Sequence, residues 1–344
     1  MREGKDLILA TKPYASEIRS SSWFHLFTTL GLLLIALTGT IMIPFFVGRL
    51  VISILSGLLI VRMFVIYHDH QHHTILQQSR VANAIMTIFG LYILAPTSIW
   101  KRSHDYHHKH NSKLFSASIG SYPIATRQKF EQMGRRERRA YLFSRHPLTI
   151  LAGYLSMFMI GMCLQSFLSS PRKHLDSLLA LVLHISGSVA ICYFLGWQTW
   201  MFFILIPFTI SCSIGAYLFY AQHNFPGVTF NDNEDWCYHE AALLSSSYML
   251  MSPVMNWFTA NIGYHHIHHL NARIPFYRLP QVMADIPELQ NAKTTSLRIK
   301  DIIACCRLKI WDPQLQRMLS LREAATLRTR GYQPQPAIVT EAVS

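Results

Sequence analysis

Residues 68–73 read His68-Asp69-His70-Gln71-His72-His73 and follow directly on an apolar run, 47–67, that is long enough to cross a bilayer. Two later stretches are alike, His104-Asp105-Tyr106-His107-His108-Lys109-His110 and His265-His266-Ile267-His268-His269. These 18 positions hold 12 of the 18 histidines, where random placement would put about one. Spacings of three and four residues place imidazoles on one helix face, and imidazole is the commonest biological metal ligand. The stretches therefore predict a multi-histidine site for two metal ions.

Apolar runs on either side of these stretches define the predicted membrane topology. Four of them approach or exceed the roughly 20 residues that a span needs: 23–44, 47–67, 178–196 and 199–220. The run 82–95 is too short and stops at Pro96. A crossing by 148–168 would separate the third histidine stretch from the other two. We therefore expect 82–95 and 148–168 to be interfacial or re-entrant helices.

Composition supports a membrane protein, because 51% of the 344 residues are hydrophobic and only 14% are charged. The six cysteines form no CxxC pair, which argues against a zinc knuckle, an iron–sulfur cluster or a disulfide framework. The predicted fold class is an all-α integral membrane protein with a single domain, 1–330. A helical cap formed by 68–147 and 224–330 carries the histidines, and 331–344 is expected to be a disordered tail.

Charge distribution predicts the orientation. Residues 101–147 carry eleven Lys and Arg against three acids, so the positive-inside rule places this loop in the cytoplasm. With four spans, both termini and all the histidine stretches lie on that side. A reporter fused after Arg172 that proved to lie outside the cytoplasm would refute this topology. The run Arg135–Arg139 is interpreted as a surface facing anionic lipid, or as a docking site for a phospholipid headgroup, an acyl carrier protein or a reductant.

The order His68-x-x-x-His72, His104-x-x-His107-His108 and a distant His265-x-x-His268-His269, interleaved with pairs of spans, resembles the membrane-bound fatty acid desaturases. Gln222-His223-Asn224-Phe225 and the residues 261–264 and 270–277 look like the bacterial acyl-lipid type of this family. The resemblance covers about 20–310. It implies two iron ions as cofactors, held by His68, His72, His104, His107, His108, His223, His265, His268 and His269. Four histidines exceed the pattern: His70, His73, His110 and His266.

The resemblance also implies the activity, which is the introduction of a cis double bond into an acyl chain with O2 and two external electrons. The expected position is delta-9 or delta-12/omega-6, and the substrate is a membrane lipid or an acyl thioester. The expected location is the bacterial cytoplasmic membrane. The chain has no GxGxxG, cysteine set or HPGG, so a ferredoxin- or cytochrome-type donor with a reductase is expected, and no nucleic acid. Asp69, Asp105 and Asn261 are predicted to orient ligating histidines.

Two alternatives remain open. Related di-iron hydroxylases, ketolases and carotenoid-modifying oxygenases share the histidine architecture and differ in whether a hydroxyl group is retained. A metal transporter would instead place its ligands inside the spans along a path, and only His184 lies in the middle of a predicted span. Neither the double-bond position nor the form of the acyl substrate follows from the sequence.

Overall fold

The computed structural model describes residues 2–114, 122–231 and 236–330; the predicted tail, 331–344, lies outside the described residues. Four helical segments in this part are long and apolar enough to cross a bilayer. They are α2 (Arg19–Met42), α3 (Phe46–Gln71), α10 (Leu175–Leu195) and a helical run from Trp197 to Ala221. The last consists of α11 (Trp197–Trp200), the π-helix η3 (Met201–Leu205) and α12 (Ile206–Ala221). The prediction of four spans is confirmed, and each overlaps its expected range.

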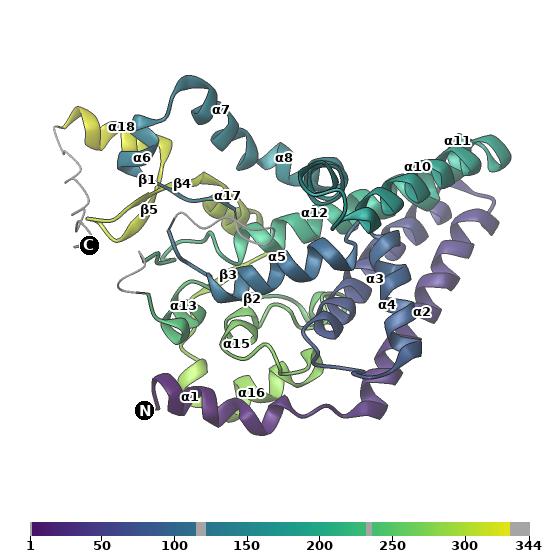
Figure 1. Cartoon of the computed structure of the whole chain (residues 1–344), viewed down its shortest axis with the longest axis horizontal. Helices are drawn as coiled ribbons and strands as arrows, with labels where there is room; N and C mark the ends of the chain where they lie inside the picture. Colours follow the sequence, from purple (N-terminus) through teal and green to yellow (C-terminus); the bar gives the residue numbers. More distant parts are fainter. Residues whose placement is uncertain (1, 115–121, 232–235, 331–344) are drawn as a thin grey trace.

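The spans form two helical hairpins (Figure 1). Pro44 lies in the turn between α2 and α3, and Gly196 lies between α10 and α11 with φ +85°, a conformation that glycine adopts without strain. Of the apolar window of α3, 61% is buried, against 11% for α10. The helix α3 is therefore the central span, whereas α10 presents its apolar side chains outward.

The two shorter apolar stretches also form helices. α4 (Arg80–Tyr92) and α5 (Thr97–Lys109) meet at 91° near Pro96, and α5 carries the second histidine stretch. The run 148–168 becomes α8 (Pro147–Leu151), the π-helix η2 (Tyr154–Gln165) and α9 (Ser166–Ser169). At Gly153 a Cβ atom would lie 2.6 Å from the carbonyl oxygen of Cys212, so glycine lets η2 approach α12 closely.

The remaining elements form the cap. Its helices are α1 (Gly4–Thr11), η1 (Lys12–Ala15), α6 (Arg127–Gln132), α7 (Arg135–Ser144), α13 (Tyr238–Leu244), α14 (Pro253–Phe258), α15 (His265–Leu270), η4 (Phe276–Arg278), α16 (Leu279–Asp285), η5 (Pro287–Leu289), α17 (Ile299–Arg307) and α18 (Leu321–Thr329). Its strands are β1 (Ala125–Thr126), β2 (Tyr248–Leu250), β3 (Thr294–Ser296), β4 (Leu308–Asp312) and β5 (Arg317–Ser320). The largely helical fold is as predicted, with these short strands added.

The strands pair across long distances in the chain. β1 pairs in parallel with β4, β4 pairs antiparallel with β5, and β2 pairs in parallel with β3. The β1-β4-β5 sheet, together with α6, α7 and α18, projects at the upper left of Figure 1, away from the first hairpin. Strands of two to five residues carry too short a pattern to be identified from sequence.

The N-terminal residues 2–18 form a strap along the cap, beside α16 in Figure 1. Arg2 donates to both carboxylate oxygens of Glu288 at 2.9–3.0 Å, and Tyr14 donates to Asp285 at 2.9 Å. Asn271, directly after the third histidine stretch, donates to the hydroxyl of Thr11 at 2.9 Å. The strap thus ties the start of the chain to the segment that carries His265–His269.

Candidate metal centre and active site

The nine histidines predicted as ligands come together in two groups. The first is His68, His72, His104, His108 and His268, and the second is His107, His223, His265 and His269. In each group the candidate ligand nitrogens all lie within 4.8 Å of one another, and only His72 is partly exposed. The rings of His108 and His269 stack at 4.3 Å, so the two groups are neighbours.

Helix geometry explains how three stretches build two groups. On α5, His104 and His108 are four residues apart and enter the first group, while His107 on the adjoining side enters the second. α15 reverses this arrangement, with His265 and His269 in the second group and His268 in the first. Each of these helices therefore contributes to both groups. The end of α3 supplies the remaining two histidines of the first group, and His223, just beyond α12, completes the second.

The Nε2 atoms converge within each group. Nε2 of His104 lies 2.8 Å from Nε2 of His68 and 3.2 Å from Nε2 of His108, which lies 3.0 Å from Nε2 of His268. In the second group the corresponding distances are 2.9–3.2 Å. Because a neutral imidazole carries one N–H, such chains of close nitrogens cannot all be satisfied as hydrogen bonds. Converging nitrogen lone pairs are the arrangement that a metal cation requires.

Two rings are oriented through their other nitrogen. Nδ1 of His223 donates to the carbonyl oxygen of Ser245 at 3.0 Å, and Nδ1 of His68 lies 3.1 Å from Oδ1 of Asp69. A proton on Nδ1 leaves the Nε2 lone pair of each neutral ring directed into its group. Asp69 also accepts the backbone N–H of Phe276 at 2.8 Å. Its buried carboxylate thus links the first and third histidine stretches.

Burial keeps these imidazoles neutral. Desolvation lowers the pKa of His223 to about 4, even though its bond to Ser245 acts in the opposite direction. For His72, His265 and His269, burial first and neighbouring imidazoles second hold the pKa well below its usual range. A neutral imidazole is the form that binds a metal.

Two of the predicted orienting residues do not reach a histidine ring in the described part of the chain. Asp105 lies 2.9 Å from the ammonium of Lys101, and its side chain is 40% exposed. It follows His104 by one position, which on a helix points it away from the ligand face. Asn261, with φ +59°, donates to the carbonyl oxygen of Phe276 at 3.2 Å instead. Asp69 is the predicted orienting residue that the structure does bring to a ligand.

The four surplus histidines lie outside the two groups and make other contacts. Nδ1 of His70 donates to the carbonyl oxygen of Ile75 at 3.1 Å, and Nδ1 of His110 donates to the carbonyl oxygen of Tyr106 at 2.9 Å. His266 is fully buried, with Nε2 lying 3.2 Å from the carbonyl oxygen of Leu289. His73 is exposed and has φ +55°.

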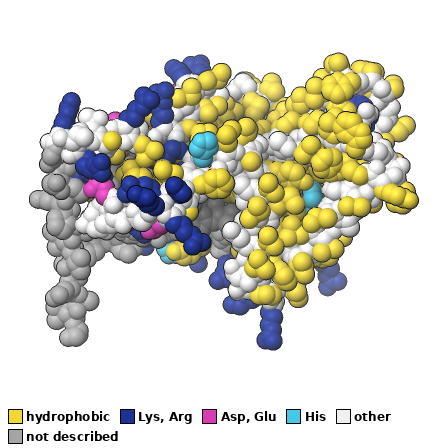
Figure 2. Space-filling view, turned by 90° about the horizontal axis from the view of Figure 1, so that it is seen from above, with side chains coloured by type: hydrophobic (Ala, Val, Ile, Leu, Met, Phe, Trp, Pro, Cys, Tyr) yellow, Lys and Arg dark blue, Asp and Glu magenta, His cyan; other side chains and the backbone are white. Residues whose placement is uncertain are grey.

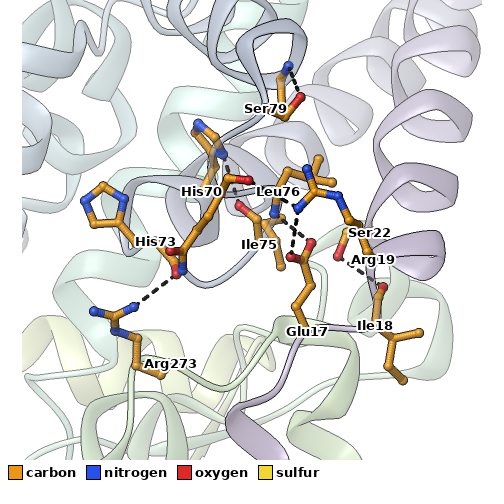
Figure 3. Close-up of polar contacts among 12 residues, drawn as sticks. Glu17, Ile18, Arg19, Ser22, His70, His73, Ile75, Leu76, Ser79 and Arg273 are labelled. Carbon is orange, nitrogen blue, oxygen red and sulfur yellow. Dashed lines mark hydrogen bonds and ion pairs between the residues drawn. The ribbon is translucent and has the colours of Figure 1, made fainter.

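The loop 73–79, directly after His72, holds contacts that the sequence pattern did not indicate (Figure 3). His73, Leu76 and Gln78 all have positive φ, which side chains other than glycine adopt at a cost. From the strap, Glu17 accepts the backbone N–H of Leu76 at 2.7 Å. Arg273, near the third histidine stretch, donates to the carbonyl oxygen of His73 at 3.1 Å. The loop after the first histidine stretch is thus fastened to the strap and to the third stretch.

An apolar cavity adjoins both histidine groups. It leaves about 580 Å³ unfilled by protein atoms, and His68, His104 and His265 form part of its wall. The rest comes mainly from α3, η2 and α12, including Phe64, Phe158 and Gly215. Trp100 stacks on His104 with ring centroids 4.8 Å apart and is fully buried. The cavity places an apolar wall directly next to the imidazoles.

Comparison with known proteins agrees with this geometry. The sequence model of the fatty acid desaturase family matches residues 43–298. The chain is 29% identical to "Fatty acid desaturase" of Bacillus subtilis over 79% of this chain and 77% of that protein. It is 26% identical to an "sn-1 acyl-lipid omega-3 desaturase (ferredoxin)" of Synechocystis over 66% of this chain and 64% of the relative. An "sn-1 oleoyl-lipid 12-desaturase" of the same organism is 22% identical over 76% and 74%.

Four apolar spans, two groups of clustered imidazoles and an adjoining apolar cavity are the features of an integral membrane protein with a candidate metal centre. More specifically, the chain belongs to the fatty acid desaturase family, because the family match covers well over half of its length. The family membership predicted from the histidine stretches is confirmed.

Proposed function

We propose that this protein introduces a cis double bond into the acyl chain of a membrane lipid, with two iron ions held by its two histidine groups. The observation that carries the proposal is the meeting of nine converging imidazoles with an apolar cavity. His68, His104 and His265 belong both to the groups and to the cavity wall. A methylene pair in the cavity would therefore lie beside the metal ligands.

The donor set fits iron. Both groups consist of imidazoles without thiolates, and imidazole suits iron, zinc and copper. His68, His72, His104, His108 and His268 would hold one ion, and His107, His223, His265 and His269 the other. Iron bound at such a site supplies the O2-derived oxidising power that removal of hydrogen from an unactivated methylene needs.

The protein's own residues then have three tasks. Asp69 and the carbonyl group of Ser245 keep two imidazoles in the orientation that directs Nε2 inward. Phe64 and Phe158 line the space proposed for the alkyl chain, and this apolar wall disfavours water beside the reacting carbons. The overall reaction consumes one O2, two electrons and two protons, and yields the alkene and two waters.

Electrons must arrive from outside, and we propose a ferredoxin- or cytochrome-type donor with its reductase. The name of one relative, "sn-1 acyl-lipid omega-3 desaturase (ferredoxin)", supports a ferredoxin. The names of other relatives specify the 12 and omega-6 positions. For this chain we propose delta-9 or delta-12/omega-6 desaturation, with the histidines on the cytoplasmic side of the bacterial inner membrane.

Expression in a bacterial host tests the function. Total fatty acids are analysed by gas chromatography–mass spectrometry, and dimethyl disulfide adducts locate new double bonds. The matched pair is His107→Ala, which removes a proposed ligand, and His110→Ala, which removes a histidine outside both groups. We expect a new unsaturated chain that disappears in His107→Ala and persists in His110→Ala. Hydroxylated or keto products would instead assign the chain to the related di-iron oxygenases.

A further inference from the structure

A second, open groove lies on the outer side of η2. It is formed by the end of α7, by α8 and by η2, and leaves about 1790 Å³ of open space among its lining residues. Phe143, Leu148 and Leu155 line it and are 68%, 67% and 55% exposed. Large apolar side chains exposed together mark a contact surface, and in a chain with four spans the adjoining phase is lipid. This groove is separate from the cavity beside the histidines.

Helix α7, whose end lines the groove, carries exposed arginines before the lining residues. On α7, Arg136 and Arg139 are exposed and precede Phe143 by seven and four residues, so all three share one helix face. Neither arginine has a carboxylate within ion-pairing distance among the described residues. Guanidinium groups match the geometry of phosphate oxygens. Figure 2 shows this face, with basic side chains gathered at the left beside a broad apolar surface.

A polar donor also lines the groove. The backbone N–H of Leu148 donates to Nδ1 of His146 at 3.2 Å, so that nitrogen carries no proton in the neutral ring. Nε2 of His146 is then a hydrogen-bond donor at the wall of the groove. The segment 136–155 therefore combines exposed cations, a neutral donor and an exposed apolar surface. An anionic glycerophospholipid carries the complementary groups, which are a phosphate, ester carbonyl groups and acyl chains.

The groove also lies next to the reaction site. Met157 of η2 lines the groove, and the next residue, Phe158, lines the cavity that contains His68 and His104. The helix η2 thus contributes to both spaces, and it is a π-helix, a form often found at functional sites. A lipid held in the groove thus keeps an acyl chain within one helix of the histidines.

From these observations we infer that the groove binds an intact anionic glycerophospholipid, with its phosphate at Arg136 and Arg139 and an acyl chain along η2. This assigns the substrate class as a membrane lipid rather than a thioester, and that part rests on the proposed function. An acidic protein would match the arginines alone, whereas a lipid matches the arginines, the donor at His146 and the apolar lining together. This combination favours lipid over the electron donor as the partner of this surface.

The test measures binding without turnover. Full-length protein in neutral detergent is titrated with fluorescent phosphatidylglycerol or with phosphatidylcholine bearing the same chains. We expect preference for phosphatidylglycerol, weakened by salt, and about thirtyfold weaker binding in the double variant Arg136→Gln/Arg139→Gln. The control Arg322→Gln/Arg330→Gln removes two exposed arginines at α18 and should bind as the parent does. Leu155→Trp should weaken binding by filling the groove, whereas Leu183→Trp on the exposed side of α10 should not.

Equal affinity for both lipids, or a double arginine variant that binds as the parent does, would overturn the inference. Loss of ferredoxin binding with lipid binding unchanged would assign the arginines to the electron donor and also overturn it. Measurements of desaturation distinguish a failure of this inference from a failure of the proposed function. Lipid binding without any desaturation contradicts the function alone, whereas desaturation of phosphatidylglycerol at the parent rate by the double arginine variant contradicts the groove alone.

Discussion

Substitution of Gly215 by leucine should block the acyl cavity without disturbing the metal ligands. Gly215 lies on α12 in the cavity wall, and a Cβ atom there would lie 3.7 Å from the ring of Phe158. That is an ordinary contact distance, so Gly215→Ala should be accepted. The branched side chain of leucine reaches further, into space that the substrate would occupy. Leucine also favours a helix over glycine by about 0.5–1 kcal/mol, so folding should not suffer.

The size of the effect follows from the cavity. One methylene too many in an apolar pocket changes the preference of an enzyme between two substrates by about 10- to 200-fold. An isobutyl group added to the wall of this cavity should therefore lower desaturation of the longest substrates by at least about 100-fold, with a shift toward shorter chains. Chain-resolved gas chromatography–mass spectrometry measures the product distribution, and iron content is measured on the same preparations.

Gly187→Leu is the matched control, because Gly187 lies in span α10 and a Cβ atom there would meet no other described atom within 4 Å. This variant should retain the parent products. If Gly215→Leu kept both the rate and the chain-length distribution of the parent, the acyl chain would not occupy the cavity, and the proposed placement of the substrate would be refuted.

Three further perturbations test other parts of the structure. Asp69→Ala removes the carboxylate beside Nδ1 of His68 and should lower iron retention during chelator dialysis about 10- to 100-fold; unchanged retention would contradict its orienting role. Glu17→Ala leaves the backbone N–H of Leu76 unpaired and should cost about 1–3 kcal/mol in thermal unfolding, whereas Glu3→Ala, which makes no side-chain cap, should not. Burial lowers the pKa of Lys309 to about 8 from 10.5, so the folded state loses its proton first and stability should rise with pH between these values. Lys309→Met should flatten that rise in pH-dependent melting curves.

The clustering of the histidines and the spans were accessible from sequence because both depend on local pattern. The length of the apolar runs identifies α2, α3, α10 and α12 as parts of spans. The i, i+4 spacing of His104 and His108 already implies that they share a helix face. The division of nine histidines into five and four was not accessible. It depends on how α5 and α15 face each other across more than 150 residues of chain.

The contacts of side chains were predicted less well where their partners lie far away in the sequence. Arg62, within α3, is expected from sequence to extend its charge toward the membrane surface. It is instead buried, donates to Thr29 at 3.1 Å, and stacks on Trp257 at 4.2 Å. Asp105 looked equivalent to Asp69, but helix geometry directs it to Lys101. Only the tertiary structure distinguishes the two carboxylates.

The strap has a consequence for biosynthesis. The ribosome makes Arg2 286 positions before its partner Glu288. His68 likewise precedes His268 by 200 positions, which at roughly 5–20 residues per second takes the ribosome roughly 10–40 s. Until then the nascent chain holds the first histidine stretch without its counterpart. Assembly of the metal centre must therefore follow insertion of the last span, and the strap docks only after the cap has emerged.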